Sequence, residues 1–204
     1  MKNKKGKAQM KIEIAVKVRP ARTKVITPLF RVSFPHVFQP HAMTEGQEKK
    51  YSVAMLFDKK TDLSPLIKLA KDTMASAFGA KAWDSGKYRK PFRDGDEKSD
   101  LGGYKGTMFA PASSFERPGL IDSNREDIIS EEDFYAGCYA KASVTCYSYD
   151  QGGNKGVAFG LQNLIKLKEG ERFSSRSSAQ DDFNVDELKE EADKLDEEES
   201  TDDI

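Results

Sequence analysis

The chain has 204 residues and a net charge of only −1, but this balance hides a strong asymmetry. The last 24 residues hold 13 acidic residues and two lysines, which leaves a net charge of +10 on the first 180 residues. With only two cysteines, the chain does not look like a disulfide-rich secreted protein. No apolar run approaches the roughly 20 residues that a membrane span needs, so we expect a cytoplasmic protein. A basic body is expected to attract polyanions.

The first half of the body is predicted to consist of strands and one helix. Residues 1–20 read as a lysine-rich arm that precedes the folded domain. Hydrophobic alternation predicts a strand over 25–34, and the segment 51–57 reads as a well-buried strand. An apolar stripe predicts a helix over 63–78, with a proline in its first turn and a glycine after its end.

Residues 80–106 form a long polar connection, and such connections are usually functional or mobile. Aromatic and cationic residues alternate within it at a density typical of a nucleic-acid-binding flap. The candidate contacts are Trp83, Tyr88, Arg89, Lys90, Phe92 and Arg93. In the alternative interpretation, Trp83 and Phe92 anchor the loop to the core and the cations are only solvated. We interpret the acidic triplet 94–96 as a turn and not as part of a calcium site.

The segment 134–149 is predicted to be the central strand, because small or apolar residues alternate with larger polar ones. Its inward face includes Cys138 and Cys146, which we expect to be buried free thiols. Its outward face is predicted to be a platform for stacking bases and binding phosphates. The platform residues are Tyr135, Tyr139, Lys141, Tyr147 and Tyr149. The alternative is a half-exposed strand face, since Tyr has a high β propensity.

One helix and five or six strands, the longest of them hairpin-like, predict a mainly β fold. The favoured architecture is a small antiparallel barrel or sandwich with an inserted helix. We place this domain at 21–173, followed by a flexible linker and acidic tail at 174–204.

The sequence offers little support for an enzyme. The two histidines, His36 and His41, are expected in one loop without nearby carboxylates to complete a metal site. Neither a nucleophile–base pair nor a phosphate-binding glycine motif is present. We therefore expect a binding protein with no catalytic residue, metal or cofactor. Acidic residues are numerous and none is singled out, so a metal-dependent nuclease stays a minor alternative.

The acidic tail has two interpretations. It solubilises the protein, or it imitates a nucleic-acid backbone, covers the basic surface and is released to partner proteins when DNA binds. In the second case Ile204, which follows the acidic Asp202 and Asp203, would bind a pocket lined by Arg and Lys on a partner protein. The tail residues assigned to partner binding are Asp196, Glu197, Glu198, Glu199, Asp202, Asp203 and Ile204.

Together these segments resemble the phage- and prophage-encoded single-stranded DNA-binding proteins with a single OB fold. The resemblance runs from about residue 25 to 183. It is carried by the order and spacing of KVITP (24–28), RVSFP (31–35), EKKYSV (48–53), PFRDGD (91–96), RPG (117–119), FYAGCY (134–139) and NKGVAFGL (154–161).

The resemblance implies an OB barrel, coating of single-stranded DNA during replication and recombination, and an acidic tail that contacts replication proteins. We then expect DNA-backbone contacts from Arg31, Lys49, Lys59 and Lys60. The main rival is a protein-binding or assembly factor that keeps the acidic tail but has no affinity for DNA.

Overall fold

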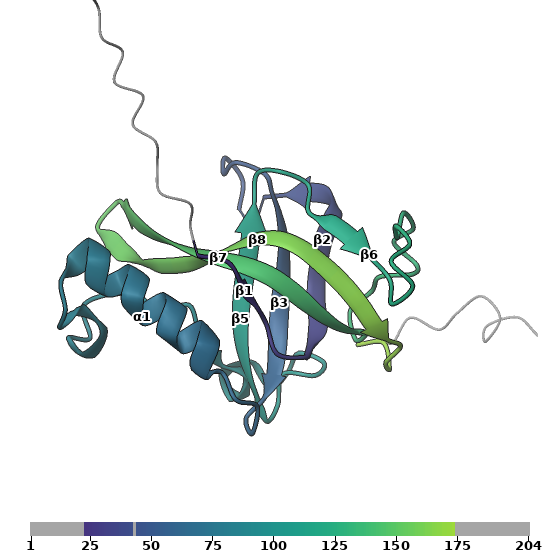
Figure 1. The fold of residues 1–204 in the computed structure, drawn as a ribbon, viewed down its shortest axis with the longest axis horizontal. Coiled ribbons are helices and arrows are strands. Elements are labelled where there is room, and N and C mark those ends of the chain that lie inside the picture. The colour runs from purple at the N-terminus through teal and green to yellow at the C-terminus, as the bar shows by residue number, and fades with distance from the viewer. Residues whose placement is uncertain (1–22, 43, 174–204) are drawn as a thin grey trace, which may run out of the picture.

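The computed structural model describes residues 23–42 and 44–173 (Figure 1). The predicted N-terminal arm and the predicted linker and tail lie outside these residues. The described elements are β1 (Val25–Ile26), β2 (Phe30–His41), β3 (Lys50–Asp58), α1 (Ser64–Phe78), η1 (Ala82–Asp84), β4 (Arg93–Asp94), η2 (Gly95–Lys98), β5 (Thr107–Ser114), β6 (Gly119–Ile121), β7 (Tyr139–Gln151) and β8 (Asn154–Lys168).

Five strands close into a barrel in the order β2–β3–β5–β8–β7, because β7 pairs with both β8 and β2. This confirms the predicted mainly β fold with one inserted helix, and a five-stranded barrel is the arrangement of an OB fold. One detail of the prediction is wrong, since β5 and β8 are parallel and the barrel is not antiparallel throughout. The long crossover through β6 and β7 separates these two strands and returns the chain in the same direction.

The barrel interior is filled by alternate residues of the strands, as their periodicity predicts. Val53, Met55 and Phe57 of β3 are almost completely buried, and Phe57 meets Phe30 of β2 edge to face at 5.7 Å. Both cysteines are buried and neither is in a disulfide, in agreement with the sequence. Burial raises the pKa of the Cys138 thiol, which favours its neutral form.

Helix α1 covers one end of the barrel beside the β7–β8 hairpin (Figure 1). Its buried residues are Leu66, Leu69, Ala70 and Met74, which form one stripe that packs into the core. Proline stands in the first turn and Gly79 follows the last turn with φ 97°, as predicted. No helix in the described part of the chain is long and apolar enough to cross a membrane.

Two predicted strands have different boundaries in the structure. The strand expected over 25–34 is divided into β1 and β2, and β2 continues to His41 through an irregularity after Ser33. The central strand begins at Tyr139, because residues 134–138 form a turn in which Gly137 has φ 117°. That turn is held by the Gly137 N–H, which donates to the Val32 carbonyl at 2.8 Å.

Gly137 is expected to be the most sensitive glycine of the barrel. Its positive φ disfavours any side chain, and a Cβ there would overlap the Glu171 carbonyl and approach the Arg172 Cα. Gly137→Ala should therefore lower the free energy of unfolding by more than the ~1–2 kcal/mol of left-handed strain alone. Urea denaturation measures this loss.

Gly153→Ala is the matched control, because Gly153 has φ 83° but no atom within 4 Å of the added Cβ. Equal losses in the two variants would contradict the steric cost that the close approach of Glu171 to Gly137 is expected to add.

Candidate nucleic-acid interface

Strand register aligns five side chains in one row on the outside of the barrel. Tyr139 pairs with Arg31, Arg31 with Leu56, Leu56 with Phe109, and Phe109 with Arg93. Paired residues of neighbouring strands point to the same side of a sheet, and their inward neighbours fill the core. The fold thus brings three sequence-predicted residues, Arg31, Arg93 and Tyr139, from separate segments into one row.

The next two rows on this wall consist mostly of small side chains. Ser33, Ala54 and Pro111 form one row, and the following row contains His36, Ser52, Ser113 and Gly160. We call the outer surface formed by these three rows on β2, β3 and β5 the β2–β3–β5 face. Successive rows are about 6–7 Å apart, and small side chains allow a flat ligand to approach the sheet closely. This wall includes the second and third barrel strands, where OB folds bind oligonucleotides.

The loop before β5 covers the Arg31–Leu56–Phe109 row. Tyr104 is 2% exposed, its ring meets Phe109 at 5.1 Å, and its hydroxyl lies 3.4 Å from the Ser33 Oγ. Burial raises the pKa of Tyr104. The Nζ of Lys98 lies 5.8 Å from the Phe109 ring centroid. Tyr104 was not predicted as a site residue, because its only signal in the sequence is a single tyrosine within the glycine-rich segment 102–106.

Arg31 is engaged within the protein. Its guanidinium donates to the carbonyls of Gly137 (3.2 Å) and Glu171 (2.7 Å) and lies 4.3 Å from the Phe173 ring centroid. It also lies 5.4 Å from the Tyr139 ring centroid. Arg31 therefore ties the segment after β8 to the barrel, beside a groove of about 490 Å³ that Arg31 and Tyr139 line.

Tyr135 does not belong to β7 and its ring is covered. The Arg172 guanidinium lies 3.7 Å from the ring centroid, and the Tyr135 hydroxyl donates to Glu169 at 2.5 Å. Burial and the hydrogen bond to Glu169 raise the pKa of Tyr135. These contacts give Tyr135 a structural role in holding the segment after β8.

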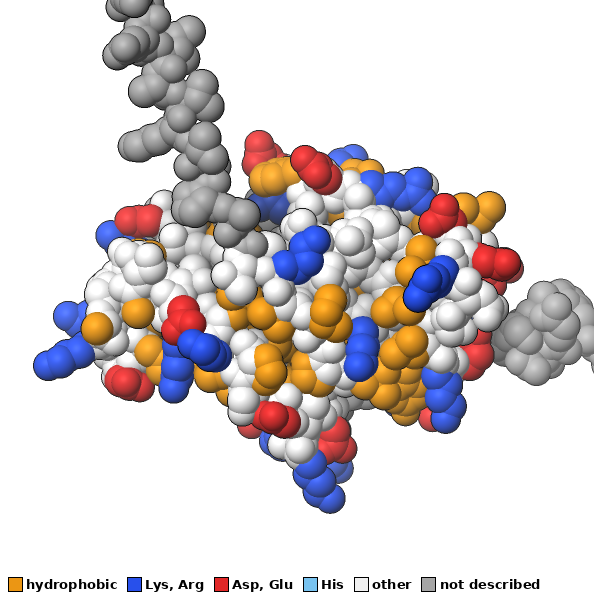
Figure 2. All heavy atoms as spheres, viewed as in Figure 1, with side chains coloured by type: hydrophobic (Ala, Val, Ile, Leu, Met, Phe, Trp, Pro, Cys, Tyr) orange, Lys and Arg blue, Asp and Glu red, His pale blue; other side chains and the backbone are white. Residues whose placement is uncertain are grey.

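The remaining platform residues do not share one flat face, because β7 is long and curves around the barrel. Lys141 pairs with Ile165, whereas Tyr147 lies 3.7 Å from the Cβ position of Gly160, next to Ser113. Figure 2 shows the wall formed by β7 and β8, where hydrophobic side chains gather with Lys and Arg between them. Tyr149 pairs with Gly156 near the hairpin turn.

Most aromatic residues of the predicted flap anchor it to the body. Tyr88 stacks on Phe78 at 4.5 Å, and Phe92 meets the buried Phe159 at 5.5 Å. Trp83 is partly buried, and the Lys90 Nζ lies 4.7 Å from its ring. These contacts match the alternative in which aromatic residues hold the loop against the core.

The predicted cations differ in how far they are neutralised. Lys59 forms ion pairs with Asp94 at 3.0 Å and with Asp96 at 2.5 Å. Lys49, Lys60, Arg89 and Arg93 are exposed, and the backbone of Arg89 pairs with that of β8. The predicted turn at 94–96 is instead the end of β4 and the start of the 3-10 helix η2, where Asp94 accepts from the Asp96 N–H at 3.0 Å and Asp96 accepts from the Gly106 N–H at 2.6 Å.

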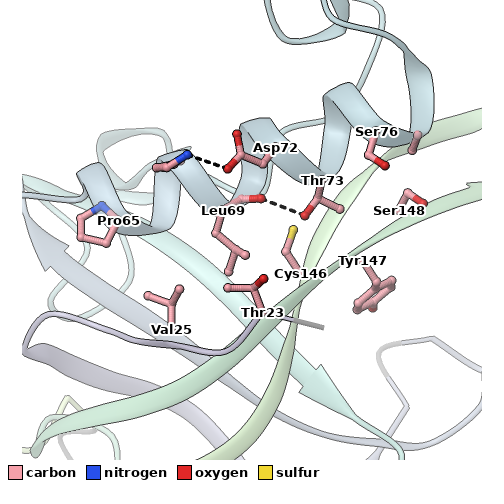
Figure 3. A pocket seen from close by; sticks show the side chains of 12 residues that line it. Thr23, Val25, Pro65, Leu69, Asp72, Thr73, Ser76, Cys146, Tyr147 and Ser148 are labelled. Atoms are coloured by element: carbon pink, nitrogen blue, oxygen red, sulfur yellow. Dashed lines mark hydrogen bonds and ion pairs between the residues drawn. The ribbon is translucent and has the colours of Figure 1, made fainter. Parts of the chain in front are cut away.

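A second hollow lies between α1, β1 and β7 and has a volume of about 710 Å³. Figure 3 shows Cys146 directed toward the helix and the Tyr147 ring on the other side of the strand. The charges at its rim compensate each other, since Lys68 and Asp72 form an ion pair at 2.8 Å. This hollow therefore lacks the cation excess that binding a polyanion needs.

The histidines lie on β2 and not in a loop, which corrects the sequence-based expectation. Their rings stack at a centroid distance of 4.4 Å. Burial and the neighbouring His41 lower the pKa of His36. Within residues 23–42 and 44–173, no three His, Cys, Asp or Glu side chains form a group that could hold a metal ion.

The barrel and its cation-bordered outer wall define a binding protein of the OB class. The family model described as "Enterobacter phage Enc34, ssDNA-binding protein" matches residues 23–195. The chain belongs to this family of phage single-stranded DNA-binding proteins, which are binding proteins and not enzymes.

Individual relatives agree with this assignment. "Putative protein p50" of Acyrthosiphon pisum secondary endosymbiont phage 1 is 32% identical over 154 residues, which covers 71% of this chain and 83% of the relative. The single-stranded DNA-binding protein of bacteriophage Enc34, solved in complex with ssDNA, has the same fold with a TM-score of 0.63, 24% identity and coverage of 74% and 89%. The single-stranded DNA-binding protein gp2.5 of bacteriophage T7 aligns with a TM-score of 0.51, 14% identity and coverage of 82% and 95%.

Arg31→Ala should destabilise the domain by about 2–3 kcal/mol, because two carbonyls are deprived of a charged hydrogen-bond donor. Arg31→Lys should recover only part of this, since an ammonium cannot form the same fork. Urea denaturation of both variants measures the effect. Arg93→Ala, at an exposed position in the same row, should leave the unfolding midpoint nearly unchanged; a destabilisation as large as that of Arg31→Ala would contradict the structural role.

Acid should weaken the Lys59–Asp96 contact. The Gly106 N–H and Lys59 lower the pKa of Asp96 below its ordinary 3.8, so the stabilisation is complete above that value and disappears as the pH falls below it. Asp96→Asn should therefore lower the Tm at pH 7, and its difference from wild type should narrow below pH ~4. Asp100→Asn, on the same loop, is the control; a Tm difference for Asp96→Asn that is independent of pH would contradict this account.

Proposed function

We propose that the protein binds single-stranded DNA without sequence specificity and coats it during phage replication and recombination. The observation that carries this proposal is the β2–β3–β5 face, which combines small side chains with cations at both ends, in a chain that belongs to a family of ssDNA-binding proteins. The net charge of +10 on the first 180 residues supports a polyanionic ligand.

At one end of the face, the sugar–phosphate backbone of the DNA would contact Arg93, Lys98 and Lys105. At the other end it would contact Lys49 and Lys50, which lie at the start of β3. Three row intervals separate the two ends, or about 20 Å along the strands. Amines that meet phosphates do not distinguish bases, so this arrangement gives affinity with little sequence preference.

The β7–β8 hairpin extends the proposed site. Tyr147 lies over Gly160 at the edge of the face, and Tyr149 and Arg89 both flank Gly156. We propose that Tyr147 and Tyr149 stack with bases and that Arg89 binds phosphate. Tyr139 would contact the DNA near the Arg31 groove.

We propose that the acidic tail competes with DNA for this face and recruits replication proteins. The position of Phe173 supports competition, because its ring packs on Gly103 and beside Arg31 and its backbone lies against Gly102, at one end of the face. Phe173, the last described residue, therefore lies beside the surface that DNA would contact. The partner contacts would come from the acidic residues 196–199 and from Asp202, Asp203 and Ile204, which lie outside the described residues.

Fluorescence anisotropy with labelled oligo-dT tests both proposals. The full chain should bind with an affinity that falls as salt rises, and a chain ending at Gln180 should bind more tightly. Unchanged affinity after truncation would contradict competition by the tail. Absence of binding by both chains would overturn the ssDNA function and favour a protein-binding factor.

A charge-removal pair locates the interface. Arg93→Ala combined with Lys98→Ala should weaken binding and reduce the slope of log K against log salt by about 0.7 for each phosphate that is no longer neutralised. Lys68→Ala, on α1 beside the second hollow, should change neither quantity. Equal effects of the two changes would show that binding follows total charge and not the β2–β3–β5 face.

A further inference from the structure

Phe34 combines two features that are unusual for a phenylalanine. Its side chain is 51% exposed, and its backbone has φ 44°, a left-handed conformation that bulky residues rarely adopt. Non-glycine residues in such conformations cluster at functional sites. The exposed ring is also absent from the buried core cluster, so core packing does not account for it.

A bulge directs this ring onto the outer wall. Ser33 pairs with Ala54 and His36 pairs with Ser52, so β2 has one more residue than β3 across this interval. Bulges of this kind redirect side chains and occur frequently next to functional sites. The Phe34 ring lies 6.5 Å from the Tyr104 ring, which covers the first row of the β2–β3–β5 face.

A second exposed phenylalanine lies where this wall ends. Phe115 is 62% exposed, and the β3–β5 register places it opposite Lys50, whose Nζ lies 4.5 Å from its ring. Lys50 in turn pairs with His41, which stacks on His36. Aromatic rings and one amine therefore follow each other across β2, β3 and β5, between Tyr104 and Phe115.

We propose that Phe34 and Phe115 are base-stacking residues and that Lys50 binds a phosphate on the path between them. This inference rests on the proposed function and deepens it, because it assigns the path of the DNA. The single-stranded DNA crosses the wall from the Phe34 bulge on β2 to the end of β5. The bases stack on exposed rings, and the Ser52–Ser113 row lets the sugar–phosphate backbone approach the sheet.

The first test compares exposed side chains on different walls. Phe34→Ala and Phe115→Ala should each weaken binding to oligo-dT by about 5- to 30-fold, which corresponds to ~1–2 kcal/mol. Ile129→Ala is the control, since Ile129 is 82% exposed but lies in the segment between β6 and β7, beside Lys166 and Leu167 of β8. Wild-type affinity in both phenylalanine variants would overturn the inference, whereas failure of the wild type to bind would overturn the proposed function itself.

Phe34→Gly separates stacking from backbone strain. Glycine accepts φ 44° without cost, so this variant should have a higher Tm than Phe34→Ala but the same reduced affinity. If Phe34→Gly instead bound DNA more tightly than Phe34→Ala, in line with its higher Tm, the ring would affect binding only by changing the stability of the fold. That result would overturn the inference.

A spectroscopic test reports contact directly. Trp83 is the single tryptophan, so subtracting the wild-type emission isolates the indole introduced by Phe34→Trp. Its fluorescence should be quenched in proportion to bound oligo-dT, because a stacked base quenches an indole. Saturated binding without quenching would overturn the inference. The inference would also be overturned if Phe34→Ala kept its affinity for DNA but changed its oligomeric state in sedimentation. That result would show that the ring contacts a second copy of the chain.

Discussion

The pairing of β5 with β8 is the constraint on which the rest of the structure depends. Only Ala112 with Phe159 and Ser113 with Gly160 join these strands, yet this contact closes the barrel. Gly160 suits this crossing, because a Cβ there would lie 2.6 Å from the Thr145 Oγ1 of β7, which would have to shift. Within the closed barrel, the β2–β3 and β3–β5 pairings place residues from distant segments in common rows, and the β2–β3–β5 face exists only because of this alignment.

The cations of the body divide into two groups according to their partners. Arg31 and Lys59 are held by carbonyls and carboxylates of the protein, so they stabilise the fold and the loop that covers the first row. Lys49 and Arg93 are exposed at opposite ends of the wall. A polyanion gains more from exposed amines, because it does not have to displace an existing partner.

The aromatic residues divide in the same way. Tyr88, Phe92 and Tyr135 each contact another ring, a guanidinium or a carboxylate of the protein, and they fix loops and chain ends. Phe34 and Phe115 instead expose more than half of their surface. Base stacking needs a free ring face, so exposure distinguishes a stacking residue from an anchor more reliably than residue type.

The sequence alone determined the class of fold, because periodicity of two records which residues of a strand face the core. It correctly predicted the buried strand β3, most of the inward face of β7, helix α1 with its proline and glycine, and the buried cysteines, and the order of its motifs indicated the family. The tertiary structure decided which wall each outward residue occupies. Three residues of β7 point to the same side of the strand but have neighbours on different parts of the barrel, since a long strand curves around it. Tyr139 lies beside Arg31, Lys141 beside Ile165, and Tyr147 beside Gly160. Alternation cannot encode that curvature, nor the bulge that exposes Phe34, because both arise from pairing with strands far away in the chain.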